Sequence, residues 1–184
     1  MSKRIAFLTA AAFGALALTA TIVAPVSAQE KTVMVGGAAM FPSKNIIQNA
    51  VNSRDHTTLV AAVKAAGLVE TLEGKGPFTV FAPTNAAFGK LPAGTVDTLV
   101  KPENKATLTK ILTYHVVAGK LEASSLTDGR KLKTVEGEEL TIKKSGDKVM
   151  IVDAKGGSST VTISNVNQSN GVIHVVDTVL MPAS

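Results

Sequence analysis

Apolar residues follow two different periods along this chain. In the first half they recur at intervals of three and four residues, which is the spacing of one face of an α-helix. From Lys131 onward they form short runs that alternate with polar residues, which is typical of β-strands. The pattern predicts helices over residues 45–52, 57–66, 68–72, 95–100, 102–114 and 121–126. It predicts strands over residues 115–119, 132–135, 140–144, 148–152, 160–165 and 172–179.

Residues 78–88 form the sharpest corner in this pattern. Two apolar sets alternate over residues 78–82, which predicts a strand with its side chains on two opposite faces. Pro83 removes a backbone donor and ends the strand, and Thr84 or Asn85 then caps a helix. Three of the six Phe residues lie in this stretch, so we expect it to be anchored in a core.

Helices that precede a β-meander predict a single α+β domain over residues 43–184. Turn residues separate the strands, and Asn170-Gly171 is the strongest hairpin signal among them. For the helix over residues 57–66 we expect Thr57 or Thr58 to be the cap. Residues 29–42 show no period and are expected to form an N-terminal arm.

Residues 1–28 have the features of a secretory signal peptide. Lys3 and Arg4 give it a basic start, an apolar run follows to Val23, and Val26-Ser27-Ala28 fit a cleavage site. A retained membrane anchor is the alternative, because the apolar run approaches the length of a span. Cleavage predicts an exported protein, periplasmic or secreted, without a membrane span.

Charge and composition narrow the classes of function. The chain has 19 Lys and Arg against 14 Asp and Glu, and loss of the signal peptide leaves 17 against 14. The lysines are scattered among acids along the sequence, and one Tyr and no Trp are available to stack on bases. We therefore expect no nucleic-acid binding. The absence of Cys excludes disulfides, thiol nucleophiles and cysteine-based metal sites.

Three blocks of sequence, in this order, resemble the signatures of the fasciclin domain family. The first is 79–88, the second is the tyrosine–histidine motif at 114–119, and the third is 170–180. The residues that carry the structural signatures are Thr79, Val80, Phe81, Ala82, Pro83, Thr84, Asn85, Phe88, Asn170, Gly171, His174 and Asp177. Those of the motif tied to adhesion in the family are Tyr114, His115, Val116 and Val117.

The resemblance implies a fasciclin-like wedge of two β-sheets with several helices on one flank. It implies that the two signatures run as neighbouring central strands. It also implies an extracellular or cell-envelope adhesion and binding module, with no enzymatic chemistry typical of the class. An Asp-Ile pair tied to integrin recognition in animal relatives corresponds here to Asn165-Val166, so integrin binding is not carried over.

The three histidines are the first candidates for a chemical site. His174 lies in an apolar strand, where we expect a core residue whose ring nitrogens are satisfied, with ligation as the alternative. His115 follows Tyr114 at a helix end, where its imidazole can bond helix carbonyls. His56 is expected on a surface loop, and Met34, Met40 and His56 together are the weak alternative of a copper site.

No motif predicts catalysis, a metal site or a cofactor. Gly-x-Ser-x-Gly and phosphate-loop patterns are absent, and the cluster Glu136, Glu138 and Glu139 is expected to face water. The sequence therefore predicts a non-enzymatic adhesion module that contacts a cell-surface or matrix protein or glycan, with weak self-association as a further option. A periplasmic protein that binds a small ligand or copper is the alternative.

Overall fold

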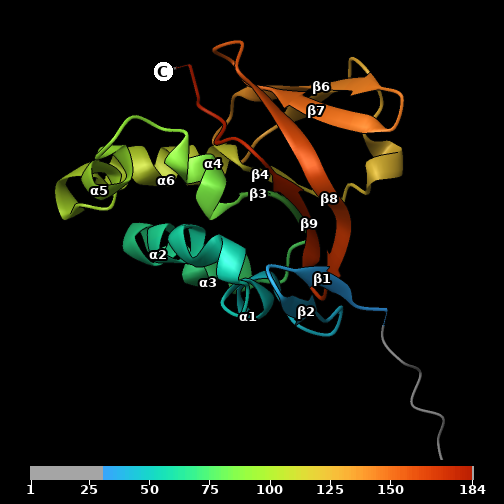
Figure 1. Cartoon of the computed structure of the whole chain (residues 1–184), viewed down its shortest axis with the longest axis horizontal. Coiled ribbons are helices and arrows are strands. Elements are labelled where there is room, and N and C mark those ends of the chain that lie inside the picture. The colour runs from blue at the N-terminus through green and yellow to red at the C-terminus, as the bar shows by residue number, and fades with distance from the viewer. Residues whose placement is uncertain (1–30, 184) are drawn as a thin grey trace, which may run out of the picture.

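The computed structural model describes residues 31–183, and its helices gather on one flank of a bent sheet (Figure 1). The expected signal peptide, residues 1–28, lies outside the described residues. The α-helices are α1 Ile46–Ala50, α2 Thr57–Ala66, α3 Val69–Glu73, α4 Asn85–Gly89, α5 Thr95–Leu99 and α6 Lys105–Tyr114. Three 3₁₀ turns are η1 Arg54–His56, η2 Pro102–Asn104 and η3 Ala123–Ser125. Every helix predicted from the apolar period is confirmed, the last one as a 3₁₀ turn.

Seven strands form one sheet in the order β4-β3-β9-β8-β7-β6-β5. They are β3 Phe78–Pro83, β4 Val116–Ala118, β5 Lys131–Lys133, β6 Glu139–Ser145, β7 Lys148–Val152, β8 Ser158–Gln168 and β9 Gly171–Val176. The two signature strands β3 and β9 are parallel neighbours inside the sheet, as the resemblance implied. Register shifts in β8 let the sheet bend into two halves. A bridge between Val117 and Thr134 joins the two ends of the sheet.

Two hydrophobic cores lie on opposite faces of β3 and β9. Val80 and Ala82 pack with the helices in the first core, and Phe81 lies in the second core between the two halves of the sheet. Every residue of β9 is buried. Both faces of the signature strands are therefore buried, and the fold class is the predicted α+β arrangement.

The N-terminal region differs from the prediction. We expected an arm without a regular pattern, but β1 Val33–Val35 and β2 Ala38–Met40 form an antiparallel hairpin. Gly36 and Gly37 both take positive φ in its turn, which a glycine pair adopts without strain. Three-residue strands are too short for a periodic signal, and packing against the domain holds this hairpin in place.

Candidate functional site

Tyr114 is the last residue of α6 and is fully buried in the second core. Its hydroxyl oxygen accepts a hydrogen bond from the Ala154 N–H at 2.8 Å and donates to the Glu139 carbonyl at 3.3 Å. Burial raises the pKa of this phenol above its usual range. The Tyr114 side chain therefore ties the end of a helix to β6 and to the turn that follows β7.

His115 ends α6 and joins it to the C-terminal segment. Its Nδ1 lies 2.8 Å from the Ile111 carbonyl, and its Nε2 accepts the Leu180 N–H at 3.0 Å. Because a backbone N–H can only donate, the proton must be on Nδ1, and the ring is neutral. Burial lowers the pKa of His115 to about 4, despite the opposing effect of the Ile111 carbonyl. The expected bond to a helix carbonyl is confirmed.

The rest of the adhesion motif, Val116 and Val117, lies in β4 and is also buried. Val116 packs in the first core and Val117 in the second. All four motif residues therefore serve the interior of the domain in this structure. Their role in adhesion stays a prediction.

His174 is a core residue with both ring nitrogens bonded, as expected. Its Nε2 lies 2.7 Å from the Leu121 carbonyl, and its Nδ1 faces the Asn165 N–H at 3.4 Å. The ring stacks on Phe81 with 5.8 Å between the centroids. Burial lowers the pKa of His174, so the ring is neutral and joins the two signature strands to a loop.

Asn165 and Val166 occupy the position of the Asp-Ile pair in animal relatives. Asn165 has a φ of 57°, and its side-chain oxygen accepts the Ala123 N–H at 2.7 Å. Val166 is 1% exposed and belongs to the first core. This segment is thus committed to internal contacts.

His56 is buried, so its expected place on a surface loop is wrong. Its Nδ1 lies 2.9 Å from the Ser53 hydroxyl, and the η1 turn carries the ring beneath α2. Its Nε2 is buried and has no hydrogen-bond partner among residues 31–183. His56 lines an apolar cavity of about 40 Å³ between the helices and β3. Burial lowers the pKa of His56.

The structure does not bring Met34, Met40 and His56 together as a copper site would require. Met34 pairs with Ala39, whereas Met40 pairs with Val33, so the two thioethers lie on opposite faces of the hairpin. Met34 is 60% exposed and Met40 is buried. Within residues 31–183, no three His, Asp or Glu side chains are grouped so that they could hold a metal ion.

Asn85 of the first signature links three elements that are distant in sequence. Thr84 caps α4 through its hydroxyl, which accepts the Ala87 N–H at 3.2 Å. The Asn85 side-chain oxygen accepts the Thr58 N–H at 3.0 Å, and its amide donates to the Arg54 carbonyl at 2.8 Å. The expected cap of α2 by Thr57 or Thr58 is therefore wrong, because a residue of α4 supplies it.

Asn170, just before β9, also links elements that are distant in sequence. Its side-chain oxygen accepts the Ile46 N–H at 3.1 Å, and its amide donates to the carbonyls of Leu72 and Gly74 at 2.7 and 2.9 Å. Gly171 follows because any Cβ there would clash with the Phe78 carbonyl. The pair is a turn, as predicted, and also the junction of α1, α3 and β3.

The remaining polar signature residues, Thr79 and Asp177, also make internal bonds. The Thr79 hydroxyl donates to the Gly119 carbonyl at 2.6 Å and accepts the Leu121 N–H at 2.8 Å. Burial alone would raise the pKa of Asp177, but bonds from the Thr160 N–H and its neighbours, together with Lys90, lower it. The signatures therefore read as a set of interior links.

The glutamates after β5 do not all face water as expected. The Glu136 carboxylate is 11% exposed and lies 3.6 Å from the Lys110 ammonium. Glu138 accepts the Ala183 N–H at 2.7 Å. Only Glu139 of the three is exposed, since it lies on the outer face of β6 whereas the other two close the turn between strands.

The lysines of β5, β6 and β7 are the surface feature that sequence reasoning missed. They are scattered among acids along the sequence, but strand pairing places Lys131, Lys133, Lys143 and Lys148 on one outer face, which we call the lysine band. Each of these lysines directly adjoins a buried apolar residue of its strand. That alternation was the available signal.

Comparison with known proteins identifies relatives along nearly the whole chain. The profile of the Fasciclin domain matches residues 54–182. The protein sll1483 of Synechocystis sp. is 46% identical, over 98% of this chain and 97% of its own length. The immunogenic protein MPB70 of Mycobacterium bovis is 40% identical over 72% of this chain and 66% of its own. The cell surface glycolipoprotein MPB83 of the same species is 40% identical over 80% of this chain and 64% of its own.

A solved structure shows the same fold. It is a FAS1 domain pair from the insect cell adhesion molecule Fasciclin I, with a TM-score of 0.68 and 17% identity. The alignment covers 77% of this chain and 52% of that one, so this chain spans about half the length of the pair. The matched profile, the relatives and the placement of the three signatures agree, and the chain belongs to the fasciclin domain family.

Proposed function

We propose that this protein is an exported, non-enzymatic binding module that attaches cells to a surface or matrix through contacts with a protein or a glycan. Its place of action is the periplasm or the outside of the cell. Family membership supports the proposal, because the relative MPB83 is by name a cell surface glycolipoprotein. Between residues 31 and 183, no helix combines the length and apolar character needed to cross a bilayer.

The observation that carries the proposal is the burial of the chemically versatile side chains. His56, His115, His174 and Tyr114 are all at most 3% exposed, and burial lowers the pKa of each imidazole. A group that cannot reach a substrate cannot serve it as an acid or a base. Binding through the outer surface is the function that remains well supported.

Ser53 and His56 form the hydroxyl–imidazole pair that most resembles a nucleophile with its base. Their polar atoms lie 2.9 Å apart, yet Ser53 is 2% and His56 is 3% exposed. A third group that orients the base is typical of such sites, but here the second ring nitrogen has no partner among the described residues. The pair therefore supports a structural role.

Deletion of the gene tests the proposal. We expect a deletion strain to attach less to cells, surfaces or matrix, and we expect the full-length gene to restore attachment. A gene without codons 2–28 is the matched control, because its product should fold but remain inside the cell. Unchanged attachment of the deletion strain in all three assays would overturn the proposed function.

A further inference from the structure

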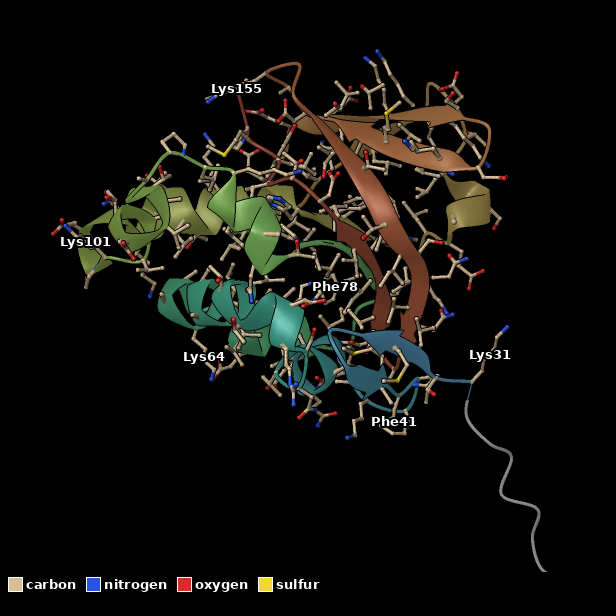
Figure 2. All side chains as sticks on the ribbon, viewed as in Figure 1. Lys31, Phe41, Lys64, Phe78, Lys101 and Lys155 are labelled. Atoms are coloured by element: carbon tan, nitrogen blue, oxygen red, sulfur yellow. The ribbon has the colours of Figure 1, made fainter. Side chains whose placement is uncertain are left out.

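The outer face of β5, β6 and β7 presents side chains in regular cross-strand rows. Leu132, Leu140, Ile142, Val149 and Ile151 are buried on the inner face, so the intervening residues point outward. The pairing aligns Lys131 with Thr141, Lys133 with Glu139, and Ser145 with Lys148. A further row pairs Lys143 with Met150. Figure 2 shows nitrogen-tipped side chains projecting from this part of the sheet, away from the helices.

The register places the four residues of the lysine band on one continuous line. Lys143 lies two positions beyond the partner of Lys131, and Lys148 lies two positions from the partner of Lys143. Such diagonal neighbours are about 7–8 Å apart. Lys133 and Lys131 are separated by one residue of β5, which is about 7 Å along a strand. Four ammonium groups therefore follow each other across the sheet, over about 20 Å.

The positive charge of the lysine band is mostly uncompensated. Lys131 pairs with Glu139 at 3.4 Å, and both side chains are more than half exposed. Across residues 31–183, no carboxylate lies within 4.0 Å of the ammonium of Lys133, Lys143 or Lys148. The other acids of this region are engaged or lie in turns. They are Asp128 on the Lys144 N–H, Glu136 on Lys110, Glu138 on the Ala183 N–H, Asp153 on three backbone N–H groups, and Asp147 in the β6–β7 turn.

A polar hollow adjoins one end of the lysine band. Its volume is about 520 Å³, and its lining includes Lys131, Lys133 and Thr141 together with three acidic residues, Glu138, Glu139 and Asp153. The carboxylates and the Thr141 hydroxyl can bond the hydroxyls of a sugar ring, while the lysines at the rim hold its charged substituents.

The same face lacks what nucleic acids and membranes would use. Residues 115–184 contain no Phe, Tyr or Trp, so the strands β5, β6 and β7 offer no ring for bases to stack on and none to insert among lipids. A flexible chain with anionic groups at regular intervals matches the line of ammonium groups best.

We propose that the lysine band binds an anionic polysaccharide, with carboxylate or sulfate groups bridging successive lysines and a sugar ring in the hollow. The inference rests on the proposed function, because it names the chemical class of the attachment partner. It predicts binding that depends on charge and weakens steeply with salt.

Binding of the purified full-length mature protein to dextran sulfate, with uncharged dextran as the reference, tests the proposal. The variant with Lys133→Gln, Lys143→Gln and Lys148→Gln removes three unpaired charges of the band. The control variant with Lys64→Gln, Lys75→Gln and Lys101→Gln has the same net charge as the band variant, and its three substituted lysines are exposed as well. Lys64 lies in α2 and Lys101 in the link between α5 and η2, both on the helical flank and away from β6 and β7 (Figure 2).

We expect the band variant to bind dextran sulfate at least about ten-fold more weakly near 0.15 M salt, and the control to stay within about two-fold of the wild type. Both should keep the wild-type melting temperature. No binding by the wild type, or equal losses in the two variants, would overturn the proposal. Equally tight binding of oligothymidylate or of phosphatidylglycerol vesicles by the band would also overturn it, in favour of a nucleic acid or a membrane.

This measurement is independent of attachment. A deletion strain that attaches normally would refute the proposed function, while band-dependent binding to dextran sulfate would still establish the polysaccharide site. Conversely, lost attachment after deletion with intact binding by the band variant would keep the function and refute this site.

Discussion

At the scale of single residues, the histidines of the family motifs serve the interior of the domain. His115 and His174 each use both ring nitrogens, one as donor and one as acceptor, to hold backbone groups of other segments. Such a ring must stay neutral, since a second proton would replace an acceptor with a donor facing an N–H. The ring nitrogens of both histidines are therefore used to join elements of the fold.

Acid should therefore weaken the fold well before its carboxylates are protonated. The folded His115 has a pKa of about 4, whereas an unfolded histidine has one near 6.5. Between these pH values the unfolded chain binds more protons than the folded one. The contribution of His115 to the free energy of unfolding is therefore fully present above pH 6.5 and is lost as the pH falls toward 4. The lowered pKa values of His56 and His174 act in the same direction.

Urea unfolding at about pH 7.5 and about pH 5 measures this effect. Between the folded and unfolded pKa values, each such histidine lowers the free energy of unfolding by about 1.4 kcal/mol for each pH unit of acidification. The variant His115→Gln is the comparison, because it cannot take up the proton. We expect its free energy of unfolding to fall less with pH than that of the wild type. Identical pH dependences would show that His115 is not a buried neutral ring.

At the scale of elements, side-chain amides cap helices and link segments that are distant in sequence. Asn85 caps α2 from α4, and Asn170 joins α1, α3 and β9. The strands and helices after residue 42 were predictable from their apolar periods, whereas the short strands β1 and β2 were not. The partners of these amides were not, because bonds between Asn170 and Ile46 span 124 residues and leave no local pattern. His56 was misplaced for the same reason.

Asn170→Ala should destabilise the domain by about 3 kcal/mol, because it leaves a buried N–H and two carbonyls without their partners. Thermal or urea unfolding measures the loss. Asn52→Ala is a suitable control, since the exposed Asn52 amide makes one bond to the Gln48 carbonyl. We expect that change to cost less than about 0.5 kcal/mol. Similar costs for both variants would contradict the junction role of Asn170.

At the scale of the whole molecule, the parts that identify the family and the surface that we propose as the binding face are separate. The signature strands β3 and β9 lie between two cores, and the adhesion motif ends in β4 beside them. The lysine band lies on the outer face of the other half of the sheet (Figure 1). Sequence comparison finds the buried half of this arrangement readily, whereas the outer face emerges only from strand register.

The most direct test of this separation is attachment of the deletion strain when it makes variants in place of the wild type. Amounts of folded exported protein are matched between strains. The account predicts that His115→Gln restores attachment fully, while the variant with Lys133→Gln, Lys143→Gln and Lys148→Gln restores little. Full attachment with the lysine variant, together with loss of attachment in folded His115→Gln, would contradict it.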